Sequence, residues 1–163
     1  MAATSIHPLL EQTIIELQRF LAVIATERQA LISGEINQLP AFAEEKSALA
    51  TRLATLESQR ENRLHEAGFA AGREGIDAWL AANAASTPTS LTSTAIPALW
   101  QQLIDLAAEA KRENETNGKL IAALTQQNQQ ALGILLGQSA DTTTYNADGQ
   151  QKSVASRRPL GSA

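Results

Sequence analysis

The sequence predicts an all-α protein: an antiparallel up-down bundle of three long helices with one short helix, followed by a flexible C-terminal tail. Two observations lead to this prediction. Apolar residues recur at alternating steps of four and three in three long segments, and this spacing places them along one edge of a helix, where another helix must cover them. Aromatic residues make up only 4% of the chain, whereas Ala, Leu, Gln and Glu are abundant. This composition favours helices over strands, and no segment is predicted as a strand.

The first predicted helix runs from about Pro8 to Ser33. Pro8 suits the first helical position, where its missing N–H costs nothing, and Gly34 suits the position just past the end. The apolar stripe of this helix is interrupted only at Arg28. The stripe consists of Leu10, Ile14, Leu17, Leu21, Ile24 and Leu31. Because only residues 34–40 connect it to the next helix, we expect those two helices to be antiparallel.

The second predicted helix runs from about Pro40 to Ala67 and is ended by Gly68. Its stripe consists of Leu39, Phe42, Leu49, Leu53 and Leu56. Residues 68–93 are richer in Gly, Ala, Ser and Thr. Within them, Ile76, Trp79 and Leu80 are spaced for one short amphipathic helix, and residues 86–93 are predicted to be a loop.

The third long helix is predicted to begin near Pro97, with Ser93 or Thr94 as its cap, and to stop at Gly137. Its middle is weakly specified, because polar residues and a glycine replace apolar ones in the stripe at Asn114, Asn117 and Gly118. Polar residues at core positions can fix the register between helices, and the Asn-Gly pair can alternatively mark a kink.

Two parts of the chain are therefore expected: a helical bundle domain at residues 1–137 and a flexible polar tail at residues 138–163. The tail offers almost no apolar surface to offset the entropy of ordering it. Tyr145 is its only aromatic residue. It is either part of an inert linker or the anchor of a short linear motif, since tyrosine buries a large area at low entropic cost.

Composition and charge exclude several classes of function. The chain has no cysteine, so disulfides, thiolate metal sites and thiol nucleophiles are excluded. Its net charge of −4 argues against nucleic acid as a partner, which requires a basic face. There is no signal peptide and no run of eighteen apolar residues, so we expect a cytoplasmic protein that is not membrane-embedded.

No motif indicates catalysis. His7 and His65 have no duplicated carboxylate or histidine neighbours of the kind that a bundle metal site uses. Gly68, Gly72 and Gly75 match neither a P-loop nor a dinucleotide-binding fingerprint, and we interpret them as a turn and a helix start. We therefore expect a protein that is not an enzyme, with no catalytic residue, no metal site and no cofactor.

The distal half of the third long helix offers a possible binding surface. If the first two helices form a hairpin, they can cover the third along only part of its length. The apolar residues concerned are Leu120, Leu124, Ala131, Leu132 and Leu135. Simple burial and an exposed groove for a partner helix are both compatible with this pattern.

Three segments carry a family resemblance, and they occur in a characteristic order. They are residues 31–46 in the hairpin region, residues 114–121 (Asn-Glu-Thr-Asn-Gly-Lys-Leu-Ile) and residues 144–150 (Thr-Tyr-Asn-Ala-Asp-Gly-Gln). In this combination the chain resembles the FlgN family of flagellar type III export chaperones. The resemblance is weakest in residues 68–93.

The resemblance implies a cytoplasmic, non-enzymatic chaperone that holds the C-terminal helical segments of the hook-associated proteins, prevents their premature association and delivers them to the type III export gate. It implies that Tyr145 docks to the cytoplasmic domain of that gate. It also implies client contacts in the segment around Asn114, and together with the candidate groove this defines a client-binding set. The set comprises Asn114, Asn117, Leu120, Ile121, Leu124, Leu132 and Leu135.

A different class of function remains open: a structural coiled-coil or adaptor module that self-associates through the same stripes. The two interpretations differ in the mass that they predict. The chaperone should be mainly a monomer without its client, whereas the coiled coil should be a stable dimer or larger.

Overall fold

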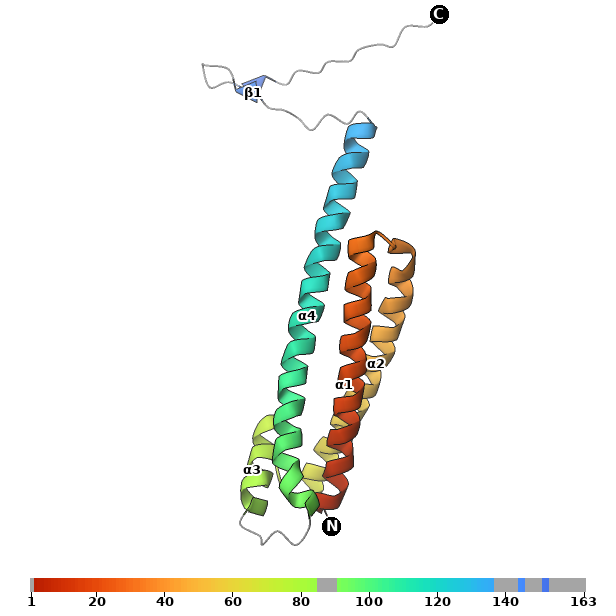
Figure 1. Cartoon of the computed structure of the whole chain (residues 1–163). Helices are drawn as coiled ribbons and strands as arrows, with labels where there is room; N and C mark the ends of the chain where they lie inside the picture. Colours follow the sequence, from red (N-terminus) through yellow and green to blue (C-terminus); the bar gives the residue numbers. More distant parts are fainter. Residues whose placement is uncertain (1, 85–90, 137–143, 146–150, 153–163) are drawn as a thin grey trace, which may run out of the picture. The chain divides into compact units, whose positions relative to one another are not determined.

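The computed structural model describes residues 2–84, 91–136, 144–145 and 151–152, and it is almost entirely helical (Figure 1). Its elements are α1 (Ala2–Ser33), the short 3₁₀ helix η1 (Ile36–Gln38), α2 (Leu39–Glu66), α3 (Gly72–Ala84), α4 (Leu91–Leu135), β1 (Thr144–Tyr145) and β2 (Gln151–Lys152). The predicted all-α class, with three long helices and one short one, is confirmed. The chain divides into two compact units, Met1–Leu120 and Ile121–Ala163, which are described separately below.

Two of the three long helices start several residues before the proline at which they were predicted to start. α1 begins at Ala2 and α4 at Leu91, so that Pro8 and Pro97 lie inside helices. The predicted caps Ser93 and Thr94 are therefore wrong, and the predicted loop is helical from Leu91 onward. A proline removes one backbone hydrogen bond from a helix. Here the added turns bury Ile6 and Ile96 completely or almost so, and this burial offsets the loss.

The predicted helix ends are closer to the structure. α1 ends at Ser33 and is followed by Gly34 at a φ of 77°, and α2 ends at Glu66, just before Gly68 at a φ of 83°. Both glycines adopt the left-handed conformation that a side chain disfavours. α4 ends at Leu135 rather than at Gly137.

The glycines between α2 and α3 have the structural role that the sequence indicated. Gly72, like Gly68, has a positive φ, of 79°. Gly75 is required for another reason: a Cβ atom at this position would lie 1.7 Å from the carbonyl oxygen of Ala70. The glycine pattern therefore makes a tight turn and lets the chain pack closely against the first turn of α3.

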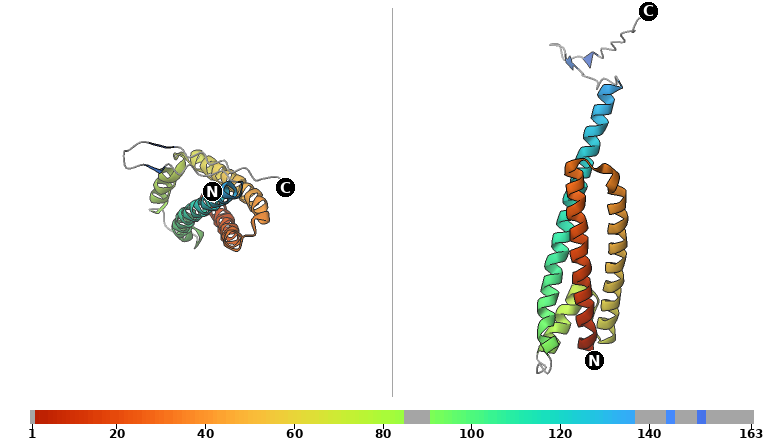
Figure 2. Two further views of the ribbon diagram at one scale, coloured as in Figure 1. Left: turned by 90° about the horizontal axis from the view of Figure 1, so that it is seen from above. Right: turned by 45° about the vertical axis from the view of Figure 1, so that its right-hand side comes forward.

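Within the unit Met1–Leu120, side-chain contacts fix the direction of the helices. Glu16 pairs with Arg52 at 3.7 Å and Glu27 pairs with Lys46 at 2.8 Å, so α1 and α2 run antiparallel. Ile6 shares a cluster with Ile96 at the start of α4, whereas residues near the end of α1 contact α4 around residue 113. This part of α4 is therefore parallel to α1, and Figure 2 shows these helices side by side.

The core lies where α1, α2, α3 and the first part of α4 meet. Its buried members are Ile6, Leu10, Ile14, Leu17, Leu64, Ile76, Trp79, Ile96, Trp100, Leu103 and Ala110. α3 closes this end of the bundle, and the indole Nε1 of Trp100 donates to Asp77 Oδ1 at 3.0 Å. The guanidinium of Arg60 lies 5.4 Å from the centre of the Trp100 ring, and burial lowers the pKa of this arginine. The predicted stripe of α1 is thus largely buried, whereas that of α2 contributes Leu53, partly buried, to this cluster and buries Leu49 outside it.

The unit that begins at Ile121 contains the distal part of α4 and a pair of two-residue strands. β1 and β2 are antiparallel, with Thr144 opposite Lys152 and Tyr145 opposite Gln151. This pair was not predicted from the sequence. The remaining tail residues, 137–143, 146–150 and 153–163, lie outside the described part of the chain. The boundary at residue 137 and the flexibility of the tail stay predictions.

Candidate functional site

Two of the polar interruptions of the apolar stripes meet in the structure. Arg28 interrupts the stripe of α1, Asn117 interrupts that of α4, and Arg28 Nε donates to Asn117 Oδ1 at 2.8 Å. Asn117 is fully buried, with an exposed fraction of 0%. Its Nδ2 donates to the carbonyl oxygen of Ile24 at 2.8 Å and to Glu27 Oε2 at 2.9 Å. The amide of Asn117 therefore has a partner for both its oxygen and its nitrogen.

Charged residues of three helices, α1, α2 and α4, contact one another beside Asn117. Lys46 of α2 pairs with the buried carboxylate of Glu27 and also donates to Asn114 Oδ1 at 3.3 Å. Arg28 pairs with Glu113 Oε2 at 2.7 Å, and this hydrogen bond lowers the pKa of the Glu113 carboxyl. We refer to these six residues as the polar layer: Glu27, Arg28, Lys46, Glu113, Asn114 and Asn117.

The polar layer fixes how α4 sits against the first two helices. Sliding α4 by one turn would separate Asn117 from its partners and leave the buried carboxylate of Glu27 with fewer donors. An uncompensated buried charge is costly, so only one register satisfies the layer. α4 continues as a helix through Asn117 and Gly118. The arrangement therefore supports a role for Asn117 in setting the register.

The structure places the predicted client-binding residues in different environments. Asn117 is buried and Asn114 is exposed. Leu120, Ile121 and Leu124 are half-buried. At the end of α4 and just after it, the strongly exposed apolar side chains are Leu132 (56%), Ile134 (79%), Leu135 (81%) and Leu136 (74%). The structure therefore does not join the predicted residues into one uniform surface.

The exposed end of α4 extends beyond the residues that the sequence singled out. We refer to Leu132, Ile134 and Leu135, together with Leu136 in the turn just after the helix, as the apolar end of α4. Ile134 and Leu136 were not predicted as site residues. Consecutive helical positions point in directions about 100° apart, so three adjacent apolar residues at 134–136 cannot all belong to one buried stripe. This run of three apolar residues could have indicated, from the sequence alone, that some of them are exposed. Clustered exposed apolar side chains are typical of interaction sites.

Tyr145, the predicted docking residue, lies in β1. Its backbone is paired with that of Gln151 in β2. Thr144 and Tyr145 are therefore extended and paired with Gln151 and Lys152, where the sequence predicted no strand.

The described residues show neither a metal site nor a membrane span. Among them, no group of three or more His, Asp or Glu side chains is placed to hold a metal ion. None of the described helices combines the length and apolar character that a membrane span needs.

Comparison with known proteins identifies the family. A family model described as "FlgN protein" matches residues 1–153. The chain is 32% identical to the flagella synthesis protein FlgN of Salmonella typhimurium over 149 residues, which cover 90% of each chain. It is 26% identical to the flagella synthesis protein FlgN of Proteus mirabilis over 154 residues, or 93% of each chain. No solved structure matches it. A match over nearly the whole chain, together with the helical architecture, shows that this protein belongs to the FlgN family.

Proposed function

We propose that this protein is a cytoplasmic flagellar export chaperone. It binds the C-terminal helical segments of hook-associated proteins, prevents their premature association and delivers them to the type III export gate. The observation that carries the proposal is the apolar end of α4, exposed in a chain whose relatives are named flagella synthesis proteins. The protein acts by binding and carries out no chemical reaction.

The apolar end of α4 suits a helical client. A segment that forms an amphipathic helix in an assembled filament exposes an apolar face before assembly, and such a face promotes aggregation. A helix with exposed leucines can cover that face by packing along it. Because the client must leave for export, the contact should be reversible, which agrees with the small number of apolar side chains involved.

The members of the client-binding set take different roles in this proposal. Leu132 and Leu135 contact the client directly, and Leu120, Ile121 and Leu124 extend the contact along α4. Asn114 is exposed and adds a polar contact. Asn117 is buried, so its role is to position α4 through the polar layer rather than to touch the client.

We expect polar substitutions on distal α4 to weaken client binding without unfolding the protein. The test is isothermal titration of a peptide with the C-terminal sequence of a hook-associated protein into the variants Leu124→Gln and Leu132→Gln/Leu135→Gln. The double variant should lower the affinity about tenfold or more, since each lost leucine contact removes about 1 kcal/mol or more. Gln127→Ala is the matched control on the same helix. Unchanged affinity, or a loss of helical circular dichroism together with the affinity, would show that these residues do not form the client site.

Tyr145 is expected to act in delivery to the cytoplasmic domain of the export gate rather than in client binding. Tyr145→Ala should leave the affinity for the client peptide unchanged and reduce export of the client, because a single aromatic anchor supplies most of the energy of a short docking segment. The measurement compares peptide affinity in vitro with secreted client in motile cells. Tyr145→Phe is the control that keeps the ring. Lost peptide affinity, or normal export by the alanine variant, would overturn this division of roles.

The alternative, a module that self-associates through its heptad stripes, receives less support. The stripe of α1 is largely buried within one chain, as Leu10, Leu17, Ile24 and Leu31 show, and Leu49 of the α2 stripe is buried as well. We therefore propose that the protein without its client is mainly a monomer at low micromolar concentration.

A further inference from the structure

A hollow of about 330 Å³ lies between α2 and α4 and is lined by residues of α1, α2 and α4. Leu17 of α1 and Leu103 of α4 are buried beside it, and Leu53 of α2 is partly buried. Three alanines also line it: Ala50, Ala54 and Ala107. We refer to this feature as the α2–α4 hollow. Its walls are mainly apolar, and its small side chains leave space between the helices.

A buried cation, Arg60, lies at one end of the α2–α4 hollow. Its exposed fraction is 6%, and its Nε is buried and donates to no acceptor in the described part of the chain. Its Nη2 contacts Glu57 Oε1 at 3.5 Å, but the side chain of Glu57 is itself 59% exposed. Burial lowers the pKa of Arg60, and the charges of Glu57 and Glu61 oppose this shift. The guanidinium has therefore lost water without gaining a full set of acceptors, which is costly.

Contacts around Arg60 hold its side chain beside the hollow. The guanidinium lies 5.4 Å from the centre of the Trp100 ring, and that ring is held by its hydrogen bond to Asp77. The hydroxyl of Thr13, which also lines the hollow, donates to the carbonyl oxygen of Leu9 at 2.7 Å. Among the side chains that line the hollow, the unused donor is thus that of Arg60. Buried donors without partners are uncommon in native proteins, and an acceptor brought by a ligand would satisfy this one.

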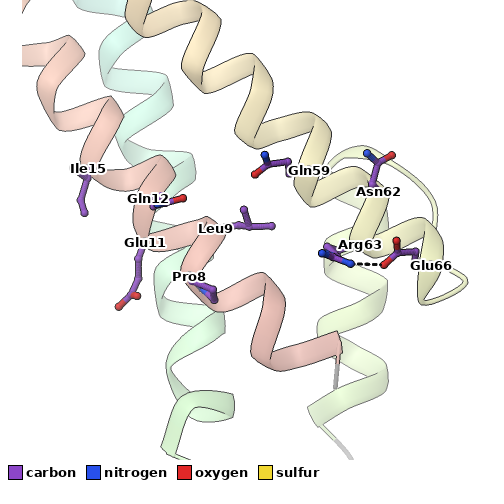
Figure 3. A pocket seen from close by; sticks show the side chains of 9 residues that line it. All are labelled: Pro8, Leu9, Glu11, Gln12, Ile15, Gln59, Asn62, Arg63 and Glu66. Atoms are coloured by element: carbon purple, nitrogen blue, oxygen red, sulfur yellow. Dashed lines mark hydrogen bonds and ion pairs between the residues drawn. The ribbon is translucent and has the colours of Figure 1, made fainter.

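A second arginine on α2 has a different environment. Arg63 lines a larger hollow of about 700 Å³ between α1 and α2 (Figure 3). Its Nη1 pairs with Glu66 Oε2 at 2.8 Å, and its side chain is 49% exposed. The charge of Arg63 is already paired and hydrated, so a ligand gains little there. The α2–α4 hollow differs because it combines apolar walls with a buried donor that has no acceptor.

We propose that the α2–α4 hollow is a binding site for an unbranched aliphatic carboxylate, such as a medium-chain fatty acid. The ligand's carboxylate accepts hydrogen bonds from Arg60, and its chain lies along the apolar walls toward Ala50. Such an amphiphile matches the hollow because the cation is at one end and the remaining length is apolar.

The dimensions of the hollow set the length of the ligand. From residue 50 to residue 60, α2 rises about 15 Å. An extended chain advances about 1.2 Å per bond, so a ligand of about ten to twelve carbons fits this length. A partner helix, about 10 Å across, is too wide to enter a hollow of this volume. The hollow shares no residue with the client-binding set, so the proposal is independent of the proposed function.

Isothermal titration of decanoate into the full-length chain, below the concentration at which decanoate forms micelles, tests the proposal. Wild type should bind one equivalent. Octanoate should bind about tenfold more weakly, because two fewer methylenes are buried. Decan-1-ol, which has no charge, should also bind about tenfold more weakly or less. No binding of decanoate, as expected if the hollow instead receives side chains of a partner protein, or equal binding of decan-1-ol would overturn the proposal.

Two pairs of variants locate the bound decanoate. Arg60→Met should raise the dissociation constant about tenfold or more, because it keeps an apolar side chain against Trp100 but removes the donors. Arg63→Met is its control on the same helix and should bind as wild type does. Ala54→Leu should weaken binding to a similar extent by filling the hollow, and Ala48→Leu is its control, since both alanines are exposed on α2 and Ala48 lies outside the hollow.

Circular dichroism checks that these variants are folded. If Arg60→Met is not, Ala54→Leu decides, because a substitution at an exposed alanine leaves the core intact. Wild-type affinity in Ala54→Leu, or in a folded Arg60→Met, would overturn the proposal. Equal losses in the two controls would do the same, since decanoate would then bind elsewhere on the chain.

Fluorescence quenching tests the orientation of the ligand. A bromine atom quenches a nearby indole, and Trp100 lies beside Arg60. At equal occupancy, 2-bromodecanoate, with its bromine next to the carboxylate, should quench the tryptophan emission more than 10-bromodecanoate does. Stronger quenching by the 10-bromo compound would contradict the placement of the carboxylate at Arg60.

Discussion

Leu17→Ala is expected to lower the free energy of unfolding by about 2–5 kcal/mol. Leu17 is 7% exposed and belongs to the cluster that joins α1 to α2 and α4. Truncating it removes apolar burial and leaves a cavity that the surrounding helices can close only partly. Urea unfolding followed by circular dichroism measures the effect as a lower midpoint with an unchanged slope.

Leu53→Ala is the matched comparison on α2. Leu53 packs against the same cluster but is only partly buried, so its truncation should cost less than that of Leu17. The sequence placed both residues in equivalent stripes and gave no reason to rank them. If both variants and wild type unfold at the same urea midpoint, the core is elsewhere. If Leu53→Ala loses more unfolding free energy than Leu17→Ala, the difference in burial between the two residues is contradicted.

The helices themselves could be predicted because their signals are local. Apolar spacing located all three long helices, and the spacing of Ile76 and Trp79 located α3. The glycines at 34 and 68 marked two ends because their backbone conformation depends on the residue itself. The starts of α1 and α4 could not be placed in the same way. Proline prefers the first position of a helix, but at Pro8 and Pro97 the burial of Ile6 and Ile96 outweighs this preference. That burial depends on contacts with helices that are distant in the sequence.

The contacts of the polar layer could not be predicted from the sequence either. Both interruptions, Arg28 and Asn117, were visible as breaks in their stripes. They are 89 residues apart, and no pattern within either helix indicates that they face each other. The burial of Arg60 could not be predicted either. An arginine in a charged segment is normally exposed, whereas Arg60 is buried against Trp100.

Asn117→Asp should destabilise the protein by about 2–4 kcal/mol near neutral pH, although the two side chains have nearly the same shape. The substitution removes both amide donors of Asn117. It also places a carboxylate where Nδ2 now lies 2.9 Å from Glu27 Oε2. Two buried carboxylates at this distance repel each other, and the cations that contact this pair in the described part of the chain are Lys46 and Arg28.

The pH dependence distinguishes this repulsion from a packing defect. Repulsion raises the pKa of one carboxyl of the pair in the folded state above its unfolded value. The destabilisation is then full above that raised pKa and disappears as the pH falls through it and the pair takes up a proton. The difference in unfolding free energy between variant and wild type should therefore shrink from about pH 7.5 to about pH 5. Asn114→Asp is the control, because an exposed carboxylate near Lys46 should cost almost nothing at either pH. A loss at Asn117→Asp that does not change with pH would mean that shape, rather than the hydrogen bonds of the polar layer, holds α4 in register.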